Sequence, residues 1–167
     1  QLINDLLNFS RYQNGLQKLS LAPCSIEDML AQAQVRFAGA AAEQGIELRV
    51  EVQGPLPRLQ ADQPQLDRVL DNLIDNALRH TAREGLIRLQ ARRHGERVII
   101  SVEDNGEGIA YGQQGRIFEP FVQVGRKKGG AGLGLALCKE IVQLHGGRMG
   151  VYSRPGQGTQ FYMALAV

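Results

Sequence analysis

The sequence is poor in cysteine and in aromatic residues, and it has no tryptophan. Its 167 residues include two cysteines and 5% aromatic residues. Cys24 and Cys138 fit no metal-binding spacing and make no disulfide framework, so we expect two buried, inert thiols. No run approaches the roughly 18 apolar residues that a membrane-spanning helix needs. With 43% apolar and 22% charged residues, the composition is that of a globular domain and excludes a mainly disordered chain.

The net charge is only +2, but it is unevenly distributed along the chain. Residues 1–78 carry 6 Lys/Arg and 10 Asp/Glu, whereas residues 110–167 carry 7 and 2. The basic part could meet phosphate, nucleic acid or an acidic partner. Its local basic run, residues 126–128, has no interleaved aromatic residues, and this argues against nucleic acid.

Local patterns predict alternating helices and hairpins. Ser25 and Asp62 have the residue types that cap helices at their amino-terminal ends, and residues 94–96 resemble a hairpin turn. Because the strands come as hairpins, we expect an α+β sandwich with a mixed sheet. The predicted helices cover residues 1–14, 26–43, 62–82 and 133–145, and the predicted strands cover residues 18–22, 46–52, 87–89, 98–102, 148–153 and 159–167, with a loop over residues 54–60.

The first segment that indicates chemistry is the helix over residues 66–81. Asn72 and Asn76 stand four residues apart, so their side chains lie on one face of the helix, with Arg79 and His80 one turn further on. Asparagine is unfavourable inside a helix because its amide competes for backbone hydrogen bonds. The two amides are therefore either ordinary surface residues or ligands for a cation or phosphate.

The second segment, residues 98–109, is an apolar strand that ends in Asp104. Gly106 and Gly108 then allow the backbone to turn and to approach another group closely. An ionised carboxylate only accepts hydrogen bonds, so at the floor of a pocket it would select a ligand with an NH₂ group, such as adenine. The alternative is a plain turn at the end of a strand.

Two further segments lie nearer the carboxyl end. In residues 129–147 a glycine cluster leads directly into an apolar helix, an arrangement that suits phosphate, although the spacing matches neither a Walker A loop nor GxGxxG. Residues 116–124 include Phe118 and Phe121, three positions apart. They are either a short helix packed on the core or part of a hinged lid.

In their order and spacing along the chain, the four segments resemble the N, G1, F and G2 boxes of sensor histidine kinases. These boxes belong to the catalytic ATP-binding domain of the gyrase, chaperone, kinase and mismatch-repair ATPase superfamily. The resemblance covers about residues 16–167 and implies the Bergerat ATP-binding fold, a two-layer α/β sandwich with a mixed sheet packed on three helices. Residues 1–15 resemble the end of the dimerisation and phosphoacceptor helix and its linker.

The resemblance also implies roles for single residues. Asn76 would coordinate Mg²⁺, Asn72 would lie near the metal-bound phosphates, and Arg79 would be a basic phosphate contact; these three are the expected catalytic residues. Asp104 would bind the adenine amine, with help from Thr159 through water. Residues 110–129 would form the lid. The other expected nucleotide contacts are His80, Gly106, Gly108, Ile109, Phe118, Gly130, Ala131, Gly132, Leu133, Gly134 and Leu135.

The implied activity is transfer of the γ-phosphoryl group of ATP to a histidine, and then to an aspartate of a response regulator. None of His80, His94 and His145 stands in a phosphoacceptor motif, and His145 ends a helix, where a partly charged imidazole is favourable. We therefore expect the acceptor helices upstream of residue 1, a monomeric fragment of a homodimer, and a cytoplasmic domain of an inner-membrane protein. The alternatives are a regulatory nucleotide-binding module of a degenerate kinase and a self-standing ATPase. In a self-standing ATPase of this superfamily we would expect a Glu at the position of Asn72, to activate water.

Overall fold

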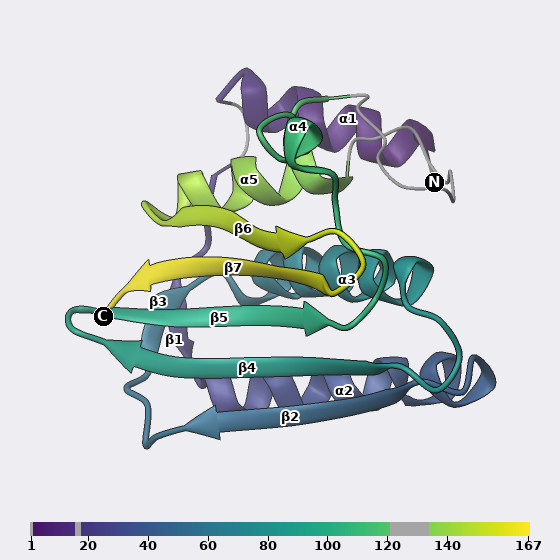
Figure 1. The fold of residues 1–167 in the computed structure, drawn as a ribbon. Helices are drawn as coiled ribbons and strands as arrows, with labels where there is room; N and C mark the ends of the chain where they lie inside the picture. Colours follow the sequence, from purple (N-terminus) through teal and green to yellow (C-terminus); the bar gives the residue numbers. More distant parts are fainter. Residues whose placement is uncertain (1, 16–17, 121–133) are drawn as a thin grey trace.

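The structure is a computed structural model that describes residues 2–15, 18–120 and 134–167, which form helices and strands in two layers (Figure 1). Each of these helices is too short or too polar to cross a membrane. The helices are α1 (Leu2–Gln13), α2 (Ile26–Glu43), α3 (Gln63–His80), α4 (Tyr111–Gln114) and α5 (Gly134–Leu144). The strands are β1 (Ala22–Cys24), β2 (Glu47–Gln53), β3 (Leu59–Ala61), β4 (Leu86–His94), β5 (Arg97–Asp104), β6 (Arg148–Arg154) and β7 (Gly158–Ala166).

One layer is a five-stranded mixed sheet with the order β2-β4-β5-β7-β6. Strands β2 and β4 are parallel, and the other neighbouring strands are antiparallel. The predicted turn at residues 94–96 does join β4 to β5, in register from Ile87 opposite Asp104 to His94 opposite Arg97. The mixed sheet and the hairpins confirm the α+β fold class.

The other layer consists of α2, α3 and α5, which lie on one face of the sheet (Figure 1). Leu66, Leu70 and Leu73 repeat along α3 at helical spacing and are buried against the sheet. Sheet residues such as Leu89 and Ile100 are also buried, because alternate side chains of a strand point to the same face. The core therefore lies between the helices and the sheet.

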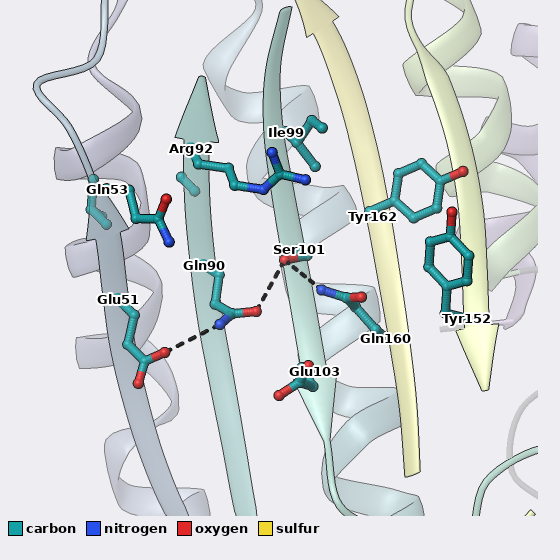
Figure 2. Close-up of a pocket in the computed structure, with 12 residues that line it drawn as sticks. Glu51, Gln53, Gln90, Arg92, Ile99, Ser101, Glu103, Tyr152, Gln160 and Tyr162 are labelled. Carbon is teal, nitrogen blue, oxygen red and sulfur yellow. Dashed lines mark hydrogen bonds between the residues drawn. The ribbon is translucent and has the colours of Figure 1, made fainter. Parts of the chain in front are cut away.

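The sheet face opposite these helices is polar. Gln90 Nε2 donates to Glu51 Oε1 at 3.1 Å, and Ser101 Oγ donates to Gln90 Oε1 at 3.4 Å. Gln160 Nε2 donates to Ser101 Oγ at 3.4 Å, so one row of hydrogen bonds crosses four strands (Figure 2). This face can therefore be in contact with water, because its side chains are polar and also form hydrogen bonds with one another.

Both predicted helix starts are confirmed. Ser25 Oγ accepts a hydrogen bond from the Asp28 N–H at 3.3 Å at the start of α2. Asp62 caps α3, where its Oδ1 accepts from the Gln65 N–H at 3.4 Å and its Oδ2 accepts from the Ser20 N–H at 2.9 Å. Each side chain replaces a partner that the first turn of a helix lacks.

The prediction for the small strands was wrong in its limits. Residues 18–21 of the predicted strand 18–22 are not in a strand, and β1 instead covers Ala22–Cys24, while β3 occupies the end of the predicted loop. Pro23 pairs with Gln60 in a sheet of only two strands. A proline is acceptable there, because on an edge strand its missing N–H need not be replaced. The pairing is a long-range contact that the local pattern does not encode.

Helix α1 packs against α5 at the edge of the helical layer (Figure 1). Phe9 is buried beside Ala136, and the Tyr12 hydroxyl donates to Gln65 Oε1 on α3. Burial raises the pKa of the Tyr12 phenol, which therefore stays protonated and able to donate. The predicted helix near the beginning of the chain is confirmed, and other apolar residues of α1 remain exposed: Ile3, Leu6 and Leu7.

Candidate functional site

A small pocket lies where the end of α3, the end of β5 and the beginning of β7 meet. It brings together residues from three of the four segments that the sequence analysis selected, and from β7. Seven of its eight lining residues are among the predicted site residues, and Phe161 is the addition. The lining residues are Asn76, His80, Asp104, Gly108, Ile109, Leu135, Thr159 and Phe161.

Asp104 is the buried charged group of this pocket. Its side chain is almost inaccessible, with 6% of the residue exposed, and its Oδ1 accepts a hydrogen bond from the Gly106 N–H at 2.9 Å. Burial raises the pKa of this carboxyl to about 6, although the Gly106 N–H and His80 act in the opposite direction. At neutral pH the group is therefore ionised and offers a hydrogen-bond acceptor to a ligand.

The glycines around Asp104 are required by close backbone contacts. A Cβ on Gly106 would lie 2.1 Å from the His80 carbonyl oxygen, and a Cβ on Gly158 would lie 2.1 Å from the Asp104 carbonyl oxygen. Gly108 has a φ of +74°, and a Cβ there would lie 2.2 Å from the Arg154 carbonyl oxygen. Only glycine fits where another backbone approaches so closely. These residues hold the loop after β5 against α3 and β6.

Thr159 is held by a hydrogen-bonded neighbour. Its Oγ1 lies 2.9 Å from Ser153 Oγ, which also donates to the Gly158 carbonyl at 2.8 Å. The same Ser153 oxygen accepts from the Ile109 N–H at 2.8 Å. Gln114 Nε2 then bonds the Ile109 and Ser153 carbonyls at 2.9 and 3.0 Å. This network joins β6, β7 and the loop that enters α4, and it fixes the Thr159 hydroxyl at the pocket.

The two asparagines of α3 have different surroundings. Asn76 lines the pocket, one turn before His80. Asn72 lies instead against the start of α5, with its Oδ1 3.6 Å from the position of a Cβ on Gly134. The Cys138 thiol donates to the Val69 carbonyl at 3.8 Å, and burial raises its pKa to about 12, although Asn72 acts in the opposite direction. The expected burial of free thiols is confirmed at Cys138 and at Cys24.

Arg79 is exposed and is not among the described residues that line this pocket. Burial raises the pKa of Asp75, one turn earlier, and the charge of Arg79 acts in the opposite direction without cancelling this rise. The neighbouring Asp71 forms an ion pair with Arg36 of α2, with 2.6 Å between Oδ1 and Nη2. The acidic residues of α3 thus have structural partners outside the pocket.

Phe118 is not among the described residues that line the pocket, but it packs against one of them, Phe161. Its ring meets that of Phe161 edge to face, with 6.0 Å between the ring centroids, and Phe161 lines the pocket. Leu135, near the start of α5, lines it from another side. Gly130, Ala131, Gly132 and Leu133 of the expected phosphate loop, and residues 121–129 of the expected lid, lie outside the described residues.

Sequence reasoning missed three residues of this region: Glu107, Ser153 and Phe161. Glu107 lies between the two selected glycines, and its Oε1 is 2.8 Å from Nδ1 of His80. Ser153 and Phe161 belong to strands whose pairing brings them to the site. Only Phe161 carried a signal, because the alternation along the last strand predicts that it is buried.

Comparisons with known proteins agree with this geometry. Residues 61–167 match the family model described as Histidine kinase-, DNA gyrase B-, and HSP90-like ATPase. The alginate biosynthesis sensor protein KinB of Pseudomonas aeruginosa is 66% identical over 166 residues, which are 99% of this chain and 28% of KinB. The chain thus spans less than a third of the length of this relative.

Solved structures give the same result. Full-length ShkA in complex with AMPPNP has a TM-score of 0.90 and 40% identity, covering 98% of this chain and 35% of ShkA. The nucleotide-free catalytic domain of the histidine kinase ThkA has a TM-score of 0.80 and 26% identity, covering 89% and 96% of the two chains. The Bergerat-type fold predicted from the sequence is therefore confirmed. The chain belongs to the family of histidine kinase-, DNA gyrase B- and HSP90-like ATPases, within which it is similar to the catalytic ATP-binding domains of sensor histidine kinases.

Proposed function

We propose that this chain binds Mg-ATP and presents its γ-phosphoryl group to a histidine of a helical domain that lies outside it. The observation that carries this proposal is the buried Asp104 carboxylate at the floor of a pocket that Asn76 of α3 also lines. The complex of the similar kinase ShkA with AMPPNP, a nucleotide analogue, supports it.

Asp104 suits the adenine end of the ligand. An ionised carboxylate accepts a hydrogen bond from the exocyclic amine of adenine, whereas the carbonyl of guanine would face it acceptor to acceptor. Thr159 would contribute through water, since its hydroxyl is held in place by Ser153 at 2.9 Å. We therefore expect selectivity for adenine nucleotides over guanine nucleotides.

Asn76 suits the metal. The described residues contain no group of three or more His, Cys, Asp or Glu side chains that could hold an ion. Mg²⁺ in a nucleotide site needs only one or two protein ligands, because phosphate and water oxygens supply the others. The amide oxygen of Asn76 fits that need. When bound, Mg²⁺ would neutralise charge on the phosphates.

We assign the phosphate contacts to Asn72, Arg79 and the glycine loop. Asn72 lies against Gly134 at the beginning of α5, and Arg79 is one turn beyond Asn76. An amide at residue 72 cannot act as a base toward water, so we expect slow hydrolysis and chemistry that depends on positioning and charge.

The remaining parts of the proposal concern the protein beyond the nucleotide pocket. We propose that residues 1–15 are the end of a dimerisation and phosphoacceptor helix, and that residues 16–167 are the catalytic domain. The fragment would be monomeric, within a homodimeric, membrane-anchored kinase whose catalytic part is cytoplasmic. Its partner would be the receiver domain of a response regulator. The similarity to KinB, a sensor protein, supports this, and ThkA has been solved together with the response regulator TrrA.

Calorimetric titration of the chain with ATP, ADP and GTP, with and without Mg²⁺, tests the proposal. We expect binding in the micromolar range for adenine nucleotides, much weaker binding of GTP, and tighter ATP binding with Mg²⁺. Equal affinity for GTP would contradict the role of Asp104. Absence of binding to all three nucleotides would favour the degenerate regulatory module, and rapid ATP hydrolysis by the chain alone would favour the self-standing ATPase.

A further inference from the structure

The end of α3 and the loop after β5 are joined twice at one pair of residues. The Glu107 N–H donates to the His80 carbonyl at 3.2 Å, and Glu107 Oε1 lies 2.8 Å from His80 Nδ1. Gly106, just before, allows this approach, because a Cβ there would clash with the same His80 carbonyl. The contact is therefore a tight one that fixes both the backbone and the side chain of Glu107.

The contact with Glu107 determines which nitrogen of the His80 ring carries the hydrogen. A carboxylate only accepts hydrogen bonds, so the Nδ1 atom of His80 carries the hydrogen in this contact. The ring nitrogen that remains for a ligand is Nε2. The His80 side chain is 14% exposed and lines the pocket beside Asn76 and Asp104, whereas that of Glu107 is 34% exposed and does not line it. Glu107 therefore acts on the pocket from outside.

We propose that Glu107 is a positioning residue for the nucleotide, which holds the His80 ring against the pocket wall with Nε2 left for the ligand. This inference rests on the proposed nucleotide binding. A side chain that is already held in its bound orientation loses less conformational freedom when the ligand binds. Loss of the contact should therefore weaken binding by about threefold to tenfold, the effect of one side chain that must be ordered.

A double-mutant cycle on ADP affinity tests whether Glu107 acts through His80. Calorimetry would compare the wild-type chain with Glu107→Ala, Glu107→Gln, His80→Ala and the double alanine variant. We expect Glu107→Ala to weaken ADP binding threefold to tenfold, and to have less than a twofold effect when His80 is already alanine. Glu107→Gln keeps an acceptor for Nδ1 and should stay within threefold of the wild type. Glu47→Ala, which removes an exposed carboxylate paired with Arg49 on the distant strand β2, is the control and should change nothing.

A second measurement is independent of the nucleotide. Long-range ¹H–¹⁵N spectra of the His80 ring above pH 8 should show the Nδ1–H tautomer in the wild-type chain and lose it in Glu107→Ala. The Nε2–H tautomer in the wild type would overturn the inference, as would an equal loss of affinity from Glu107→Ala with and without His80. If the wild-type chain binds no ADP, the proposed function fails. If it binds ADP and Glu107→Ala binds equally well, only the present inference fails.

Discussion

Nε2 of His145 accepts a hydrogen bond from the Asp62 N–H at 3.1 Å, while its Nδ1 lies 2.9 Å from the Ile141 carbonyl oxygen. The ring thus joins the end of α5 to the start of α3, with Nδ1 donating and Nε2 accepting. The sequence-based interpretation placed His145 at the end of its own helix, and the structure adds the contact with the start of α3.

Replacement of His145 by alanine should lower the free energy of unfolding by about 1–2 kcal/mol, because it removes two hydrogen bonds from a partly buried site. Urea unfolding of the nucleotide-free chain measures this. The matched control is His94→Ala in the exposed turn between β4 and β5, which should stay within about 0.5 kcal/mol of the wild type. Equal stability of the two variants would show that the contact between α5 and α3 contributes nothing.

Asp104→Asn should weaken adenine nucleotide binding and stabilise the empty protein. The asparagine can turn an NH₂ group toward the ligand amine and loses the charge-assisted bond, at a cost of about 1.5–3 kcal/mol in binding. The fold favours the protonated carboxyl, so that this contribution to stability is present at low pH and is lost as the pH rises through about 6. At pH 8 the neutral amide should therefore raise the free energy of unfolding by about 1–3 kcal/mol. Calorimetry and thermal unfolding of the same two proteins test both halves, and a variant that is destabilised and binds ADP normally would contradict them.

The affinity for ADP should depend on pH near 6. Because the ligand needs the ionised carboxylate, binding should be nearly constant from pH 7 to 8.5 and weaken by about tenfold per pH unit well below 6. Titrations at half-unit intervals provide the profile, and Asp104→Asn is the control that should not show this decrease. An unchanged profile in that variant would assign the titration to another group.

Gly106→Ala should damage both the fold and the site. The new Cβ would meet the His80 carbonyl oxygen at 2.1 Å, so the loop after β5 must move away from α3. Crowding of this kind costs about 1–3 kcal/mol of stability, and ADP affinity should fall as well. Gly112→Ala in α4 is the matched control, because its Cβ meets nothing within 4 Å. It should be neutral or slightly stabilising in thermal unfolding.

Asn76→Ala should affect chiefly the part of ATP binding that depends on Mg²⁺. We expect the gain in ATP affinity on adding Mg²⁺ to shrink by about tenfold, while the affinity for ATP without metal changes little. Titrations with Mg²⁺ and with a chelator separate the two effects. Asp71→Ala, which removes a partner of Arg36 on another face of the same helix, serves as the control. An equal loss with and without Mg²⁺ would count against a metal role for Asn76.

The sequence predicts the parts of this fold that depend on local interactions. Ser25 and Asp62 mark the starts of their helices because a cap and its partner lie within three residues of each other. The end of β5 at Asp104 follows from its apolar run and the glycines after it. The position of β1 around Pro23 could not be predicted in this way, because it depends on pairing with residues about forty positions away.

The same distinction applies to the site. Asn76, His80, Asp104 and Thr159 were predicted from motifs, and the structure brings all four to one pocket. Their supporting contacts were not predictable, since Ser153 contacts Ile109 across 44 positions. The roles assigned to the predicted site residues remain predictions.

The strand order has a consequence for how the pocket forms during folding. Asp104 belongs to the hairpin of β4 and β5, Thr159 belongs to the hairpin of β6 and β7, and the two residues face each other only where β5 pairs with β7. Neither hairpin alone contains the pocket. A ligand bound there would therefore bind only the fully assembled domain. By mass action it would stabilise the junction between the two halves of the sheet by an amount that grows with the logarithm of the ratio of its concentration to its dissociation constant.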